Sequence, residues 1–84
     1  MNHEMEKQLK DILVEFIEAE QHEKINALQE EDELANVGFN SITFVKIAIK
    51  IEETFDITID DDDLSYLRFP TLKSICDYIN KKKN

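Results

Sequence analysis

Val37-Gly38-Phe39-Asn40-Ser41-Ile42 marks the point where this chain passes from a polar connection into a long amphipathic helix. Gly38 allows the turn into that helix, because glycine adopts backbone conformations that other residues avoid. Asn40 or Ser41 then serves as the N-cap, since short polar side chains accept hydrogen bonds from the first free amides of a helix. The pattern predicts a helix from about Ser41 to Phe55.

This helix carries two apolar stripes instead of one. At about 100° per residue, the first stripe fits the core-facing side of a small bundle; it comprises Phe44, Ile47, Ala48, Ile51 and Phe55. The second stripe lies on the far side and comprises Ile42, Val45 and Ile49, flanked by Lys46, Glu52 and Glu53. Because a bundle helix normally carries charge on its outer face, the second stripe is typical of a contact surface. Two alternatives stay open: the long connection buries these aliphatics, or they are ordinary scattered exposed side chains.

The remaining periodic segments also favour helices. Apolar residues at three- and four-residue spacing predict a first helix from about Glu4 to Ala19; they are Met5, Leu9, Ile12, Leu13 and Phe16. Asp60 to Tyr66 fits one short helical turn with aspartates at its positive end. A last helix follows Pro70 with Thr71 as N-cap; its inward residues are Leu72, Ile75, Cys76 and Ile79, and it ends in Lys81-Lys82-Lys83. The prediction is an all-α, small four-helix bundle, with three main helices and one short helix.

The chain reads as a single domain over residues 1–84, because 84 residues are enough for one modest core. Between about residues 20 and 40 the periodicity lapses into an acid-rich loop, and long loops are usually functional or mobile. Its expected anchors are Ile25, Leu28, Leu34 and Val37. Residues 81–84 are expected to form a flexible tail.

The charge balance limits the partners. With 19 acidic and 10 basic residues the formal net charge is −9, which repels nucleic acid and anionic lipid and favours a basic patch on a protein partner. No apolar run approaches the roughly 18 residues that a membrane span needs. Cys76 is the only cysteine, and no charged-then-apolar leader opens the chain. We therefore expect a monomer in the reducing cytoplasm that binds neither nucleic acid nor membrane.

No residue pattern indicates a catalytic or metal site. His3 and His22 come without a nucleophile motif. The run from Asp60 to Asp63 lacks the alternating ligands, the glycine and the final glutamate of a calcium loop. Cys76 has the spacing of a small buried hydrophobe, and three aromatic residues are expected to pack the short and last helices: Tyr66, Phe69 and Tyr78. We expect a protein that is not an enzyme.

The stretch from Leu34 to Ile79 resembles the acyl carrier and peptidyl carrier protein family. Gly38-Phe39-Asn40-Ser41-Ile42 is similar to that family's Gly-x-Asp-Ser-Leu signature, and the end of the helix at Phe55 resembles its Glu-Glu-x-Phe. Pro70-Thr71-Leu72 and Ile75-Cys76-Asp77-Tyr78-Ile79 look like its last helix. The matches come in the family's order and spacing over most of the chain.

In that family the signature serine receives 4′-phosphopantetheine from coenzyme A, through a separate Mg²⁺-dependent phosphopantetheinyl transferase. The resemblance implies that Ser41 is the attachment residue, although spacing alone indicates a helix cap. It also implies docking of the transferase, of loading enzymes that adenylate or transfer acyl groups, and of downstream enzymes. The residues assigned to docking are Ile42, Val45, Lys46, Ile49, Glu52 and Glu53.

Two departures from the family pattern bear on the pathway. Asn40 stands where fatty-acid carriers typically have aspartate, and Lys46 where they often have glutamate. These residues favour a free-standing carrier of a specialised acyl, aryl or aminoacyl group, of nonribosomal peptide or polyketide type. The open alternatives are a housekeeping fatty-acid acyl carrier protein, a relative that docks without cargo, a carrier of D-alanine, and a helical interaction adaptor with an unmodified serine.

Overall fold

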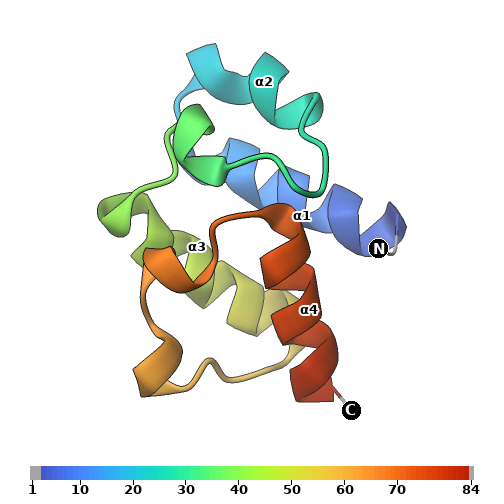
Figure 1. Cartoon of the computed structure of the whole chain (residues 1–84), viewed down its shortest axis with the longest axis vertical. Coiled ribbons are helices and arrows are strands. Elements are labelled where there is room, and N and C mark those ends of the chain that lie inside the picture. The colour runs from blue at the N-terminus through green and yellow to red at the C-terminus, as the bar shows by residue number, and fades with distance from the viewer. Residues whose placement is uncertain (1–2, 84) are drawn as a thin grey trace.

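The computed structural model describes residues 3–83, and these residues form helices joined by short turns (Figure 1). The four α-helices are α1 (His3–Phe16), α2 (His22–Asn26), α3 (Ser41–Phe55) and α4 (Leu72–Lys83). Four 3₁₀ turns lie at Ala19–Gln21, Leu34–Val37, Asp61–Asp63 and Tyr66–Arg68. Residues 3–83 contain no strand, apart from an isolated bridge between Glu33 and Thr71. The predicted all-α helical bundle is confirmed.

The core lies between the three long helices. α1 packs against α2, α3 and α4, and α3 and α4 lie below it in Figure 1. All the residues predicted to face inward from α3 and α4 are buried. In α1 the inward residues are buried except Phe16, which is half-buried and packs against the core. Burial of these apolar stripes is the main stabilising contribution to the fold.

The connection from residue 17 to residue 40, which was predicted as a loop over about residues 20–40, contains short helical segments. α1 ends at Phe16, before the predicted Ala19, and Glu18 is extended. The Nε2 atom of His22 donates to the carbonyl oxygen of Ile17 at 2.9 Å. This side chain takes the place of the backbone amide that would bond to this carbonyl if the helix continued. The chain then forms α2, and the predicted anchors are all buried; they are Ile25, Leu28, Leu34 and Val37.

The two ends of α4 are fixed by different interactions. At its start, Thr71 Oγ1 accepts from the Ser74 amide and Ser74 Oγ accepts from the Thr71 amide, each at 3.1 Å, so the predicted cap at Thr71 is confirmed. At its end the helix continues to Lys83, so residues 81–83, where a flexible tail was expected, are helical in the structure. Basic residues at the negative end of the helix dipole favour this last turn. Asn84 lies outside the described residues.

Between α3 and α4, two 3₁₀ turns replace the single turn predicted over Asp60–Tyr66. A row of aromatic rings ties this segment to both helices. Phe44 of α3 packs edge-on against Phe39 and stacks on Phe69, with centroids 5.9 and 5.7 Å apart. Phe69 in turn packs edge-on against Tyr78 of α4 at 5.2 Å. The row therefore fixes the start of α3 relative to the chain that faces it.

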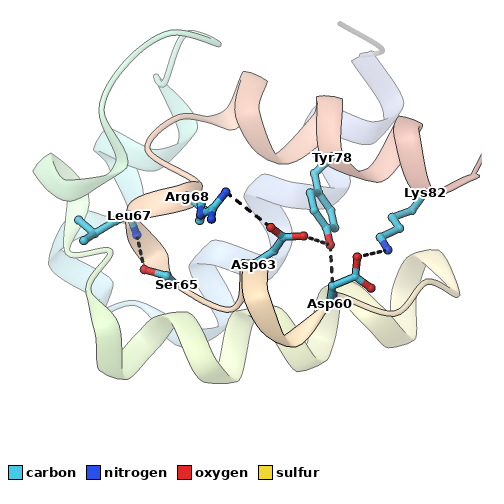
Figure 2. Close-up of polar contacts among 7 residues, drawn as sticks. All are labelled: Asp60, Asp63, Ser65, Leu67, Arg68, Tyr78 and Lys82. Atoms are coloured by element: carbon cyan, nitrogen blue, oxygen red, sulfur yellow. Dashed lines mark hydrogen bonds and ion pairs between the residues drawn. The ribbon is translucent and has the colours of Figure 1, made fainter.

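Polar contacts of Tyr78 hold the first of these turns (Figure 2). The hydroxyl accepts from the Asp60 amide at 3.1 Å and donates to Asp63 Oδ2 at 3.0 Å. Burial of the side chain raises the pKa of Tyr78 above its ordinary value, and Asp63 adds to this increase. Lys82 donates to Asp60 at 2.7 Å, and Arg68 lies 3.7 Å from Asp63. Two of the four consecutive aspartates are thus engaged in holding the fold.

Replacing Tyr78 with phenylalanine should lower the free energy of unfolding by about 1 kcal/mol, because two hydrogen bonds are lost while the ring packing stays. Faster hydrogen exchange is expected at the Asp60 amide, which loses its acceptor. Urea denaturation and amide exchange measure the two effects. A variant with wild-type stability and wild-type exchange at Asp60 would show that the hydroxyl does not hold this turn.

Candidate functional site

Ser41 is the first residue of α3, and its hydroxyl takes no part in capping the helix. The cap is Asn40, whose Oδ1 accepts from the amides of Ile42 at 2.9 Å and Thr43 at 3.1 Å. Thr43 Oγ1 accepts in return from the Asn40 amide at 3.0 Å, which completes a capping box. Within residues 3–83 no hydrogen bond joins the Ser41 hydroxyl to another residue. The exposed hydroxyl is therefore available for chemistry.

Gly38 makes the turn that leaves Ser41 outside the fold. Its φ of 89° lies in the region that favours glycine, and a Cβ there would lie 3.3 Å from Cγ2 of Ile17. The turn buries Phe39, which is 3 % exposed, while Asn40 and Ser41 stay at the surface. The buried ring next to the cap thus anchors the position from which Ser41 projects.

The electrostatic surroundings of Ser41 suit an anionic group. The amides of the first turn of a helix lack acceptors within the helix, and their dipoles place partial positive charge at the N-terminus. The sequence from Val37 to Ile51 contains no aspartate or glutamate. A phosphate ester on Ser41 would therefore meet favourable dipoles and no nearby acidic side chain from this stretch.

A mostly apolar hollow of about 370 Å³ opens beside Ser41. One side of it belongs to α3, and the other belongs to the chain around the two 3₁₀ turns. Its lining comprises Ser41, Phe44, Val45, Ala48, Ile49, Glu52, Leu64, Ser65 and Tyr66. By contrast, the space between the aromatic residues inside the bundle is only about 10 Å³, about the minimum for one water molecule. A bound group next to Ser41 thus has room at the surface and not in the core.

Among residues 3–83, the large hydrophobic side chains that stay exposed lie on α3 and on the segment facing it. We call this set the apolar surface: Ile42 (75 % exposed), Val45 (57 %), Ile49 (52 %), Leu64 (46 %) and Leu67 (73 %). The predicted second stripe of α3 is therefore uncovered by its own chain. Leu64 and Leu67 were not predicted, because short 3₁₀ turns give no periodicity from which to read an outer face. The sequence feature that could have indicated their exposure is their three-residue spacing directly after the acidic run from Asp60 to Asp63.

The structure separates the three charged residues that were predicted to dock partners. Lys46 and Glu53 are exposed and line a second, shallow groove with Ile49. Glu52 is half-buried, and its Oε2 accepts from the Ile59 amide at 2.8 Å. Glu52 therefore holds the chain that leaves α3, although it also lines the hollow beside Ser41.

Other chemically active side chains lie away from this site. Cys76 is buried, and burial raises its pKa to about 11, so it stays a thiol at neutral pH. No group of three or more His, Cys, Asp or Glu side chains within residues 3–83 is placed to hold a metal ion. Among the same residues, none of the helices combines the length and apolar composition needed to cross a bilayer.

Comparison with known proteins agrees with this geometry. The family model of the phosphopantetheine attachment site matches residues 7–79. The chain is 31 % identical over 78 residues to an acyl carrier protein of Desulforapulum autotrophicum, covering 93 % of this chain and 96 % of that protein. It is 38 % identical over 48 residues to an acyl carrier protein of Syntrophobacter fumaroxidans, covering 57 % of each. The chain therefore belongs to the phosphopantetheine-attachment family of acyl and peptidyl carrier proteins, whose members bear covalent 4′-phosphopantetheine.

Proposed function

We propose that Ser41 bears the 4′-phosphopantetheine arm, and that the protein is a free-standing carrier of a thioester-bound acyl, aryl or aminoacyl group between enzymes of a biosynthetic pathway. The observation that carries this proposal is the exposed, unpartnered hydroxyl at the start of α3, directly beside the apolar surface. When bound, 4′-phosphopantetheine supplies a terminal thiol on a flexible chain. Tethering to one residue raises the effective concentration of the cargo at each docked enzyme.

The residues around Ser41 fit this role as a substrate of other enzymes. Asn40 takes over the capping of α3, so the hydroxyl of Ser41 is not engaged. The positive end of the helix dipole stabilises the negative charge of a phosphodiester at this position. Neither sequence neighbour of Ser41 is a base, so deprotonation of the hydroxyl is left to the transferase.

The apolar surface serves as the docking surface for the transferase and for the loading and downstream enzymes. Uncovered aliphatic side chains next to the modified residue are typical of a site that partners cover. Lys46 and Glu53 lie at the rim of this surface, where charges act mainly on encounter and specificity. Glu52 contributes chiefly by holding the chain that leaves α3.

Asn40 and Lys46, in place of the acidic residues typical of fatty-acid carriers, support a specialised pathway of the nonribosomal peptide or polyketide type. The second candidate is a housekeeping fatty-acid acyl carrier protein, which the names of the two similar proteins favour. Either carrier would work in the cytoplasm. Offering the protein that bears the arm with a free thiol to a malonyl transferase and, separately, to an amino-acid-adenylating enzyme distinguishes the two pathways by the cargo that is accepted.

Attachment of the arm is tested by intact-mass measurement. The wild-type protein is incubated with coenzyme A, Mg²⁺ and a phosphopantetheinyl transferase of broad specificity, and a parallel reaction omits coenzyme A. We expect the mass to increase by one 4′-phosphopantetheine group only in the complete reaction. An unchanged mass, while an established carrier in the same tube is modified, would contradict the proposal.

A count of reactive thiols provides a second prediction. At about pH 8 the folded protein before attachment should react very slowly with a thiol reagent, because Cys76 is buried and its pKa is raised to about 11. After attachment one thiol should react quickly, and denaturation should expose a second. Absorbance of the released reagent measures all three states. Rapid reaction of the folded, unmodified protein would show that Cys76 is accessible.

A further inference from the structure

The first part of α3, from Ser41 to Ile51, differs in charge from the chain as a whole. The formal net charge of the protein is −9, yet the stretch from Val37 to Ile51 contains two lysines and no acidic residue. The acidic residues are concentrated before this stretch, in the run from Glu30 to Glu33, and after it, in the run from Asp60 to Asp63. The part of α3 from Ser41 to Ile51 is therefore a basic stretch on an acidic protein.

The ammonium groups of the two lysines of this region, Lys46 and Lys50, make no polar contact that holds the part of the fold within residues 3–83. Within residues 3–83 neither ammonium group forms an ion pair or a hydrogen bond with a carboxylate. Three lysines of the other long helices do so, with the Nζ atom 3.4 Å from Glu6 for Lys10, 2.9 Å from Asp77 for Lys73 and 2.7 Å from Asp60 for Lys82.

The positions of Lys46 and Lys50 do not favour the stability of α3 through the helix dipole or through each other. Lys46 and Lys50 are four residues apart, a spacing at which like charges repel. Acidic residues near the start of a helix and basic residues near its end would be favourable, but α3 has neither. Glu52, near the end, has a structural partner in the Ile59 amide, whereas the lysines have none. Helix stability therefore does not explain the two lysines.

The lysines border the apolar surface. Lys46 and Lys50 line the shallow groove that contains Ile49, one of the three exposed aliphatic residues of α3. Glu15 and Glu53 line the same groove without forming an ion pair with either lysine. Basic side chains next to uncovered aliphatics form the pattern of an interface with an apolar centre and a charged rim.

We infer that the enzyme surface that docks on α3 presents an apolar patch bordered by carboxylates, which face Lys46 and Lys50. This inference rests on the proposed function, because it assumes that α3 is the face presented to processing enzymes. It replaces the basic partner patch that the net charge alone suggested, since a basic rim would meet like charge at these lysines. Charge at this rim selects the partner, and the exposed aliphatic residues contribute the apolar contact.

Two synthetic helical peptides provide the probes for this inference. They share one apolar face of leucine and tryptophan, and their polar faces consist of glutamate in one and lysine in the other. Each is titrated into ¹⁵N-labelled protein without the arm, and the amide shifts of Ile42, Val45 and Ile49 report binding on α3. At low salt we expect the glutamate peptide to bind there about tenfold more tightly than the lysine peptide, with a smaller difference at high salt.

Charge-reversed variants distinguish the effect of the local charge on peptide binding from the effect of the net charge of the protein. Lys46→Glu/Lys50→Glu should remove or invert the preference on α3, and the neutral Lys46→Gln/Lys50→Gln should abolish it. The control Lys7→Glu/Lys24→Glu changes the net charge equally, at exposed residues of α1 and α2, and should keep the preference. The inference is overturned if the lysine peptide binds α3 as tightly as the glutamate peptide, or if the reversed variant keeps the wild-type preference.

The peptide titration does not depend on attachment of the arm. Ser41→Ala, which lacks the hydroxyl that would be modified, should show the same preference for the glutamate peptide as the wild type. Failure of attachment together with an intact preference would overturn the proposed function alone. Normal attachment on Ser41 without the preference would overturn only the inferred acidic rim of the partner.

Discussion

Replacing Ser41 with alanine is expected to abolish attachment of 4′-phosphopantetheine completely while changing the free energy of unfolding by no more than about 0.5 kcal/mol. The variant removes the acceptor oxygen, but this oxygen has no hydrogen-bond partner among residues 3–83. Alanine is also a good helix former at an exposed position. Intact mass after incubation with coenzyme A and the transferase measures attachment, and urea denaturation measures stability.

Two control variants, one at the neighbouring cap residue and one at another serine, are compared with Ser41→Ala. Asn40→Ala removes the side chain that accepts from two amides of α3 and should cost about 1 kcal/mol of stability. Ser65→Ala changes another serine at the same hollow and should leave attachment complete. Full modification of Ser41→Ala, or its unfolding under conditions where the wild type is folded, would refute the assignment of a chemical and non-structural role to Ser41.

Replacing Phe44 with alanine is expected to lower the free energy of unfolding by about 3–5 kcal/mol. Phe44 is 5 % exposed and lies between the rings of Phe39 and Phe69, so the variant leaves a cavity in the row of aromatic residues. Small domains have total stabilities of only about 5–15 kcal/mol, so this is a large fraction of the whole. The adjacent residue should behave in the opposite way, because Val45 is 57 % exposed and Val45→Ala removes little buried area.

The two neighbours are compared by urea denaturation under identical conditions. We expect Val45→Ala to stay within about 0.5 kcal/mol of the wild type, as surface substitutions usually do. Equal losses for Val45→Ala and Phe44→Ala would mean that the outer stripe of α3 is buried in solution. The apolar surface would then be unavailable to partners, and its assignment to docking would be wrong.

The predictions for α3 succeeded because its signals are local and repeated. Fifteen residues with a 3.6-residue period, a capping residue and a glycine turn specify both its ends and both its faces. The connection before it was harder to predict. α2 spans only five residues, too few for a periodic pattern, and its position depends on the burial of Ile25 and on the contact of His22 with Ile17. A single buried side chain and a single side-chain hydrogen bond do not produce a periodic pattern in the sequence.

The candidate site, like the fold, could be predicted only in part from the sequence. Local spacing alone would have made Ser41 a helix cap, and its chemical role came from the resemblance to a family. The capping box explains why the two roles do not compete, since Asn40 accepts the hydrogen bonds that a capping serine would accept. The path of the chain after α3 determines two further features, the hydrogen bond from the Ile59 amide to Glu52 and the exposure of Leu67. Neither feature produces a periodic pattern in the sequence.

Fragmentation mass spectrometry of the modified protein tests most directly whether Ser41 carries the arm. The protein is treated with coenzyme A and the transferase and then digested, and the peptide containing residues 38–46 is fragmented. We predict that this peptide carries the full mass of one 4′-phosphopantetheine group and that the fragment ions place it on Ser41. An arm located on Ser65 or Ser74, or an unmodified peptide under conditions that modify an established carrier, would contradict the account.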